Sequence, residues 1–154
     1  MKRLLLIIAI LLLFPSFAFG EVITTCGASK GYGYYFEGGI VPKDKSGWSE
    51  DSISKGHIIL VLEGDGKEFN IYYKDAEMTK SAKEDGGKVL LAHLDENFQT
   101  IMILVIYPGQ GVVEHYLFRL DGSGNGGVVW GNDKGTNLMA KGTLFKATCS
   151  KRNQ

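Results

Sequence analysis

The sequence predicts an all-β protein, a single antiparallel β-barrel or sandwich of about eight strands. Short apolar or alternating segments recur between turns rich in Gly, Asp and Asn, and no segment has the apolar period of an amphipathic helix. The only two cysteines, Cys26 and Cys149, lie toward the two ends of the domain. Their positions predict a disulfide that joins the N- and C-terminal strands.

Residues 1–20 have the features of a secretory signal peptide. A basic pair precedes an uncharged apolar stretch at residues 4–14, and small residues, Ala18 and Gly20, stand at the −3 and −1 positions of a cleavage site. The apolar stretch is too short to span a membrane stably. We therefore expect a single exported β domain at residues 21–154, periplasmic or extracellular, with no membrane span after cleavage.

The charge pattern excludes two classes of partner. The chain has 17 basic and 17 acidic residues, and the basic residues form no stripe, so we expect binding neither to nucleic acid nor to anionic lipid. No phosphate-cradling loop leads into a helix, so nucleotide binding has no support. We expect no cofactor.

The first strand is predicted at residues 31–37, where aromatic residues recur with period two. Tyr32, Tyr34 and Phe36 should share one face of this strand, and Tyr35 should lie on the other. Its expected neighbour in space is the C-terminal strand.

Residues 38–56 are rich in Gly, Lys, Asp and Ser and predict a long loop. Such a loop is either a binding element or an Ω-loop, which would tuck Trp48 into the core. The next two segments, 57–63 and 68–74, flank an Asp-Gly pair, which predicts a β-hairpin. Residues 75–87 are polar and predict an irregular connection.

A strand at 88–94 leads into the central hairpin of the domain, which we place at residues 98–120. The first strand of this hairpin is apolar on both faces, so it needs cover on both sides. That cover must come from residues 38–56, from residues 75–87 or from another chain.

The last third of the chain predicts three further short elements. A strand at 128–130 is followed by a turn around residues 132–135, a short segment at 137–140 and a last strand at 142–149.

Two serine motifs raise the alternative of a small extracytoplasmic hydrolase. Ser29 stands in a G-x-S-x-G pattern and Ser52 in an S-x-x-K pattern. Neither has the strand, helix or companion motifs that the corresponding enzymes need. The three histidines, His57, His93 and His115, fall on three different predicted strands and would bind zinc only if their rings converged. We therefore expect no catalytic set and no resident metal.

Residues 121–126 raise a second alternative, a structural calcium site. Asp121, Ser123 and Asn125 supply oxygen ligands at positions one, three and five of an EF-hand pattern. The twelfth position is Asn132 where a glutamate is expected, and Asp133 is a conceivable extra carboxylate. The same residue types are ordinary in hairpin turns.

Four aromatic residues are the best candidates for ligand binding: Tyr34, Trp48, Tyr107 and Trp130. Large rings near strand ends can line a cavity and can offer a polar group to a ligand. The competing interpretation is that they fill the core. We expect a non-enzymatic binding or interaction module whose partner is a small ligand or another protein.

Overall fold

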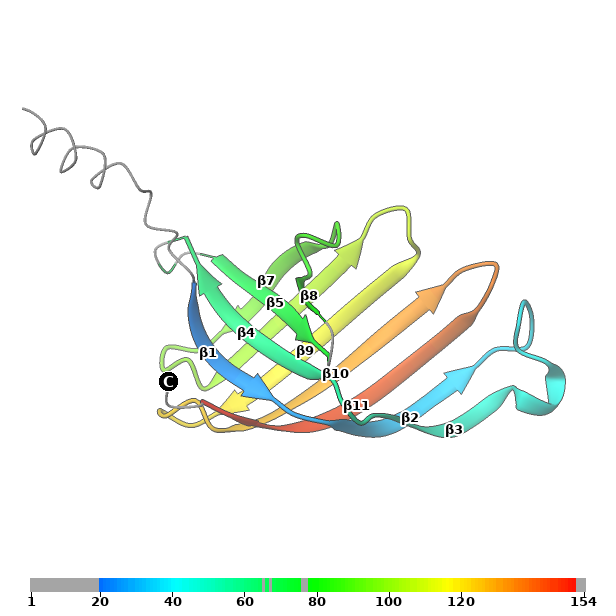
Figure 1. Ribbon diagram of the computed structural model, residues 1–154, viewed down its shortest axis with the longest axis horizontal. Helices are drawn as coiled ribbons and strands as arrows, with labels where there is room; N and C mark the ends of the chain where they lie inside the picture. The colour runs from blue at the N-terminus through cyan, green and yellow to red at the C-terminus, as the bar shows by residue number, and fades with distance from the viewer. Residues whose placement is uncertain (1–19, 65, 67, 76–77, 152–154) are drawn as a thin grey trace, which may run out of the picture.

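The computed structural model describes residues 20–151 except 65, 67 and 76–77. These residues form one antiparallel sheet that curls into a half-barrel (Figure 1). The all-β class is confirmed. The predicted signal peptide, apart from Gly20, lies outside the described residues.

The described residues form eleven strands and one short 3-10 helix. They are β1 (Glu21–Cys26), β2 (Ser29–Tyr35), η1 (Lys43–Lys45), β3 (Gly47–Ile53), β4 (His57–Glu63), β5 (Glu68–Lys74), β6 (Thr79–Ser81), β7 (Lys88–Leu94), β8 (Thr100–Tyr107), β9 (Val112–Leu120), β10 (Gly126–Gly135) and β11 (Ala140–Ser150). The order across the sheet is β6-β5-β4-β1-β11-β10-β9-β8-β7, and β2 pairs with both β11 and β3. The predicted partner of β2, the C-terminal strand, is confirmed.

Two pairs of strands are each one long strand with a bend. β1 and β2 both pair with β11, with Cys26 opposite Cys149 and Lys30 opposite Lys146. Between these two pairs, β1 and β2 advance by four residues while β11 advances by three, which indicates a β-bulge. β3 and β4 bend beside them, because they pair with β2 and β1 in turn. The eleven strands therefore occupy nine positions across the sheet, close to the predicted number.

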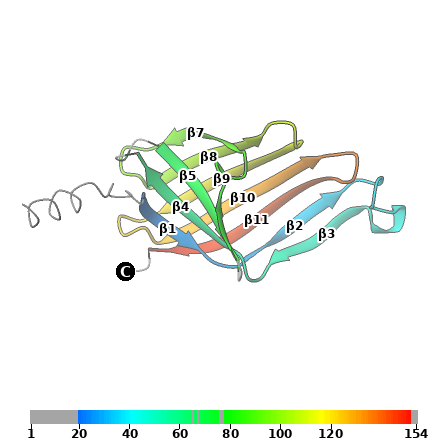
Figure 2. The ribbon, with the colours of Figure 1, turned by 45° about the horizontal axis from the view of Figure 1, so that its top comes forward.

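β4 and β5 arch over one half of the concave face (Figures 1 and 2). The core lies between this arch and the strands β8 and β9, where Leu60 and Ile71 pack in one buried cluster with Ile103 and Phe118. The connection at 75–87 adds to this core through a fully buried Ala82. It therefore helps to close this half of the barrel from the concave side.

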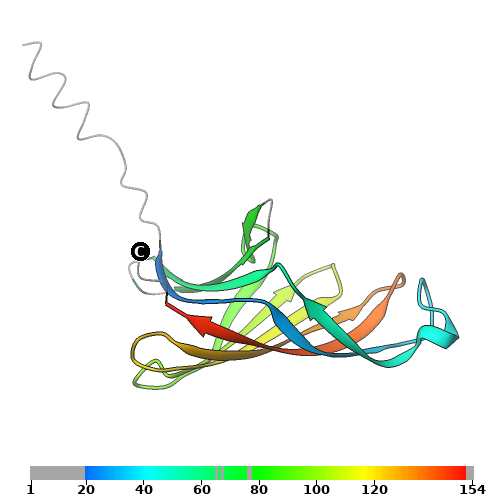
Figure 3. The same cartoon turned by 60° about the horizontal axis from the view of Figure 1, so that its bottom comes forward.

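The other half of the concave face has no such arch. β5 pairs with β4 but not with β3, so the arch ends at the bend, and β2 and β3 run on past it (Figure 3). The inward residues here are largely polar, and they include Asp51, Asn132, Lys134 and Lys141. The half-barrel thus has a closed apolar half and an open polar half.

The predicted loop at 38–56 is wrong, because β3 occupies most of its second half. Trp48 is not tucked into the core: its side chain is 74% exposed on the convex face. The reason lies in the position of β3 at a sheet edge. An edge strand with solvent on both faces is built from polar residues and lacks the apolar alternation that marks a half-buried strand.

The predicted turn at 132–135 is also wrong, since β10 runs unbroken from Gly126 to Gly135. The side-chain hydroxyl of Thr143 accepts a hydrogen bond from the Asn132 N–H at 3.1 Å and donates one to its carbonyl oxygen at 3.0 Å. Residues 132–135 are of types that usually form turns, but here they continue β10 because the sheet lines the open polar half of the concave face.

The central hairpin is confirmed as β8 and β9, but the cover predicted for its outer face is not found. Met102 is 41% exposed, and Leu117 beside it is exposed to a similar degree. Part of the 75–87 segment packs on the concave side instead, where Gly87 lies against Val105 and Tyr107. The convex face of the hairpin is thus bare in the described part of the chain.

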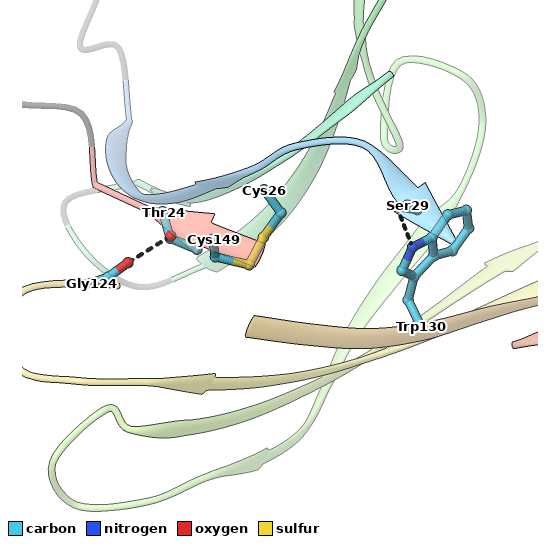
Figure 4. The surroundings of a disulfide bond; sticks show 6 residues. All are labelled: Thr24, Cys26, Ser29, Gly124, Trp130 and Cys149. Carbon is cyan, nitrogen blue, oxygen red and sulfur yellow. Dashed lines mark hydrogen bonds between the residues drawn. A yellow bond between two sulfur atoms is a disulfide. The ribbon is translucent and has the colours of Figure 1, made fainter. Parts of the chain in front are cut away.

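The predicted disulfide between Cys26 and Cys149 is confirmed. It joins paired residues of β1 and β11, and both cysteines are buried. Beside it, the Thr24 hydroxyl donates a hydrogen bond of 2.7 Å to the carbonyl oxygen of Gly124 (Figure 4). These two links hold the ends of the domain together.

Removing the disulfide should lower stability without changing the fold. The bridge spans a sequence separation of 123 residues, and the chain-entropy model gives a loop of that size about 4–5 kcal/mol. The double variant Cys26→Ala, Cys149→Ala should lose about that much unfolding free energy in urea. Adding reductant should weaken the wild type similarly and leave the variant unchanged. A loss below about 1 kcal/mol would contradict the prediction.

Candidate functional site

A buried carboxylate lies where the closed and open halves meet. Glu114 on β9 is 8% exposed. Its Oε2 accepts hydrogen bonds from the hydroxyls of Tyr116 at 2.8 Å, Tyr107 at 3.3 Å and Tyr73. Its Oε1 accepts one from the Asn132 side-chain amide at 2.9 Å. We call these five residues the Glu114 cluster.

Four strands bring the Glu114 cluster together. Glu114 and Tyr116 are two residues apart on β9 and therefore share its concave face. Tyr107 ends the neighbouring strand β8, and Asn132 lies directly opposite Glu114 on β10. Tyr73 comes from β5 in the arch. Its bond to Glu114 thus links the arch to the sheet across the concave space.

Among the residues that the structure describes, only neutral donors bind the Glu114 carboxylate. The ion pairs of the described residues involve the carboxylates of Glu21, Asp51, Glu63, Glu68 and Asp85, but not that of Glu114. Phenol and amide dipoles point their positive ends at the carboxylate and hold its charge. A buried charge without a countercharge is uncommon, and it is a reason to look for a ligand.

The cluster perturbs its tyrosines. Burial raises the pKa of Tyr107 to about 12, and the charge of Glu114 contributes to the rise. Burial also raises the pKa of Tyr73 and of Tyr116 well above the ordinary range, and Glu114 again adds to both shifts. The three hydroxyls therefore keep their protons and remain donors to the carboxylate.

The Glu114 cluster borders a cavity of about 500 Å³ on the concave face. One wall is aromatic: the rings of Trp130 and Phe145 stack with centroids 4.8 Å apart. The rim is polar and includes Asp51, Lys134 and Lys141. Lys141 lies 4.0 Å from the carboxylate of Asp51. The cavity therefore combines an apolar wall, a charged rim and a buried carboxylate.

The four aromatic candidates fall on opposite faces of the sheet. Tyr107 and Trp130 line the concave cavity. Tyr34 and Trp48 lie on the convex face with Phe36, and the centroids of the Tyr34 and Trp48 rings are 5.4 Å apart. We call Tyr34, Phe36 and Trp48 the outer aromatic cluster. The structure thus separates two candidate surfaces that the sequence grouped as one.

Sequence reasoning missed the most distinctive groups of the cavity, Glu114, Tyr73 and Asn132. A signal for Glu114 was present: it alternates in phase with the buried residues Tyr116 and Phe118. A carboxylate on an otherwise apolar face predicts a buried, satisfied charge. Tyr73 carried no comparable signal, because its role depends on how the arch folds over the sheet.

Ser29 is placed as a structural residue. Its hydroxyl oxygen is buried and accepts a hydrogen bond of 3.1 Å from the Trp130 indole N–H (Figure 4). Ser29 and His57 line a second cavity of about 290 Å³, and Asp75 lines it too. The described hydrogen bonds do not join Ser29 to His57. The arrangement thus lacks the contact between nucleophile and base that a serine hydrolase uses.

The proposed metal sites receive no support from the geometry. Within the described residues, no three His, Cys, Asp or Glu side chains converge as metal ligands would. In the turn at 121–126, the Asp121 carboxylate accepts the backbone N–H groups of Ser123 at 2.8 Å and Asn125 at 3.0 Å. These bonds lower the pKa of Asp121 and are those of an ordinary Asp-capped turn.

No helix in the described part of the chain is long and apolar enough to cross a membrane. Comparison of the chain with protein-family models, with curated proteins and with solved structures gave no match.

The raised pKa of Tyr107 predicts a decline of stability in alkali. Unfolded tyrosine ionises near pH 10, whereas folded Tyr107 does so at about 12. The stabilisation that protonated Tyr107 gives the folded state is therefore complete below about pH 10 and is lost as the pH rises toward about 12. Urea unfolding across this range should show a steeper loss for the wild type than for Tyr107→Phe. Equal slopes would contradict the prediction.

Proposed function

We propose that this chain is an exported, non-enzymatic binding module that holds a small ligand in the open half of its concave face. The observation that carries the proposal is the Glu114 cluster at the border of the cavity of about 500 Å³. Small-molecule sites combine a cavity of about 300–1,000 Å³, apolar walls and a few convergent polar groups. Export rests on the signal-peptide features of residues 1–20.

The ligand that suits this cavity is amphipathic. Trp130 and Phe145 give the cavity an apolar wall made of ring edges, because the Trp130 ring is stacked between the rings of Tyr116 and Phe145. The Glu114 carboxylate offers a deep polar anchor, and Lys134 and Lys141 offer polar contacts at the rim. A ligand with an apolar body and one polar end would use each of these groups.

The outer aromatic cluster is the competing site, and it would suit a protein partner or a sugar. Its rings are more exposed than those of the cavity, as Trp48 at 74% against Trp130 at 5% shows. The hollow that these rings line is larger, about 740 Å³, but the buried carboxylate anchor lines only the concave cavity. We therefore favour the cavity for a small ligand.

The two tryptophans allow a direct test, because one reports on each site. Trp48→Phe leaves Trp130 as the sole tryptophan, and Trp130→Phe leaves Trp48. Each variant is titrated with a panel of small amphipathic amines, acids, alcohols and sugars, and its fluorescence is followed. We expect a saturable change with Trp48→Phe and no change with Trp130→Phe.

Circular dichroism and thermal melts of both variants serve as the control for folding. A saturable change only in Trp130→Phe would move the binding site to the outer aromatic cluster. No change in either variant across the panel would refute the proposed small-ligand function.

A further inference from the structure

We propose that the ligand of the concave cavity carries a primary ammonium group, which donates a hydrogen bond to Oε1 of Glu114. This inference rests on the proposed function and narrows it to one chemical class of ligand. It depends on three features of the cavity: the free capacity of the carboxylate, the aromatic wall and the distribution of charge.

The first feature is the unequal use of the two carboxylate oxygens. Oε2 of Glu114 accepts from three phenols, whereas Oε1 accepts only from the Asn132 amide. A carboxylate oxygen has two lone pairs, which the three phenols must share at Oε2, whereas Oε1 has a single donor among the described residues and can take one more N–H or O–H donor. Glu114 lines the cavity and keeps 8% of its surface exposed. A donor on the ligand can therefore complete the site.

The second feature is that a cationic donor is favoured over a neutral one. The carboxylate is buried among neutral donors, and a charged donor there makes a stronger, charge-assisted bond. The rings of Tyr107, Trp130 and Phe145 line the same cavity. These rings make the wall apolar, and a hydrogen bond between a charged donor and the carboxylate is stronger in such a low-dielectric setting than in water. The wall therefore strengthens the preference that the carboxylate sets.

The third feature is the charge of the whole lining. Three carboxylates, those of Asp51, Asp85 and Glu114, face two lysines, Lys134 and Lys141. Asp51 and Lys141 pair with each other at 4.0 Å, and Asp85 lies 3.7 Å from Lys80, so Glu114 is the lining carboxylate that takes part in none of the described ion pairs. Glu114 is therefore the carboxylate that a monovalent cation on the ligand would neutralise. A bare metal ion is not favoured, because the described residues offer no group of three metal-binding side chains.

The test uses three probes of one shape that differ in charge: phenethylammonium, phenethyl alcohol and phenylacetate. Each is titrated into Trp48→Phe near neutral pH, with Trp130 as reporter. Because charge-assisted hydrogen bonds exceed neutral ones by a kcal/mol or more, we expect the ammonium to bind roughly tenfold or more tightly than the other two. Glu114→Gln in the same background should abolish that preference.

Glu50→Gln is the matched control. It makes the same substitution on the exposed convex side of β3, where Glu50 lies beside Tyr32, and it should leave the preference intact. If Glu114→Gln fails to fold, the relative affinities of the three probes for Trp48→Phe, which retains Glu114, still test the inference. A fourth probe, the trimethylated ammonium, keeps the charge but has no N–H donor, and it should bind less tightly than phenethylammonium.

Five results would overturn the inference. Equal affinity for phenethyl alcohol and phenethylammonium would show that the site does not distinguish charge. Tighter binding of phenylacetate would assign recognition to the lysines. An ammonium preference that survives in a folded Glu114→Gln would assign it to another group. A fourth result is a Trp130 response to other members of the amphipathic panel but to none of the three probes. That result would support the proposed small-ligand function and contradict the ammonium inference. No Trp130 response at all would remove the binding function itself.

Discussion

The hydrogen bond from Tyr73 to Glu114 is the interaction on which the shape of this half-barrel depends. It joins β5 in the arch to β9 in the sheet, two strands that do not pair. A buried carboxylate is costly unless donors surround it, so Glu114 fixes where the arch, β8 and β10 must place their polar groups. The same carboxylate marks the end of the apolar core and the start of the open polar half.

Much of the fold could be predicted from local pattern. The hairpins β4–β5 and β8–β9, the alternation of β2 and the disulfide all followed from period-two spacing, turn residues and cysteine count. The edge strand β3 could not, because its residues are polar on both faces, as Ser49 and Glu50 illustrate. The end of β10 could not either, since Asn132 and Asp133 are residues that usually form turns.

The candidate site was only half predictable, for a geometric reason. Alternation shows that Tyr34 and Tyr35 lie on opposite faces, but it does not show which face is concave. Tyr107 and Trp130 therefore stood beside Tyr34 and Trp48 as equal candidates until the curl of the sheet separated them. The Glu114 cluster draws on four strands, and contacts between strands that do not pair leave no periodic trace in the sequence.

A double-mutant cycle between Tyr73 and Glu114 tests most directly whether this bond joins the arch to the sheet. Unfolding free energies of the wild type, Tyr73→Phe, Glu114→Gln and the double variant give the coupling between the two side chains. Contact across the concave space predicts a coupling of about 1.5–3 kcal/mol, the range for a hydrogen bond to a charged group. Effects that add within about 0.5 kcal/mol would show that the arch and the sheet do not meet at Glu114.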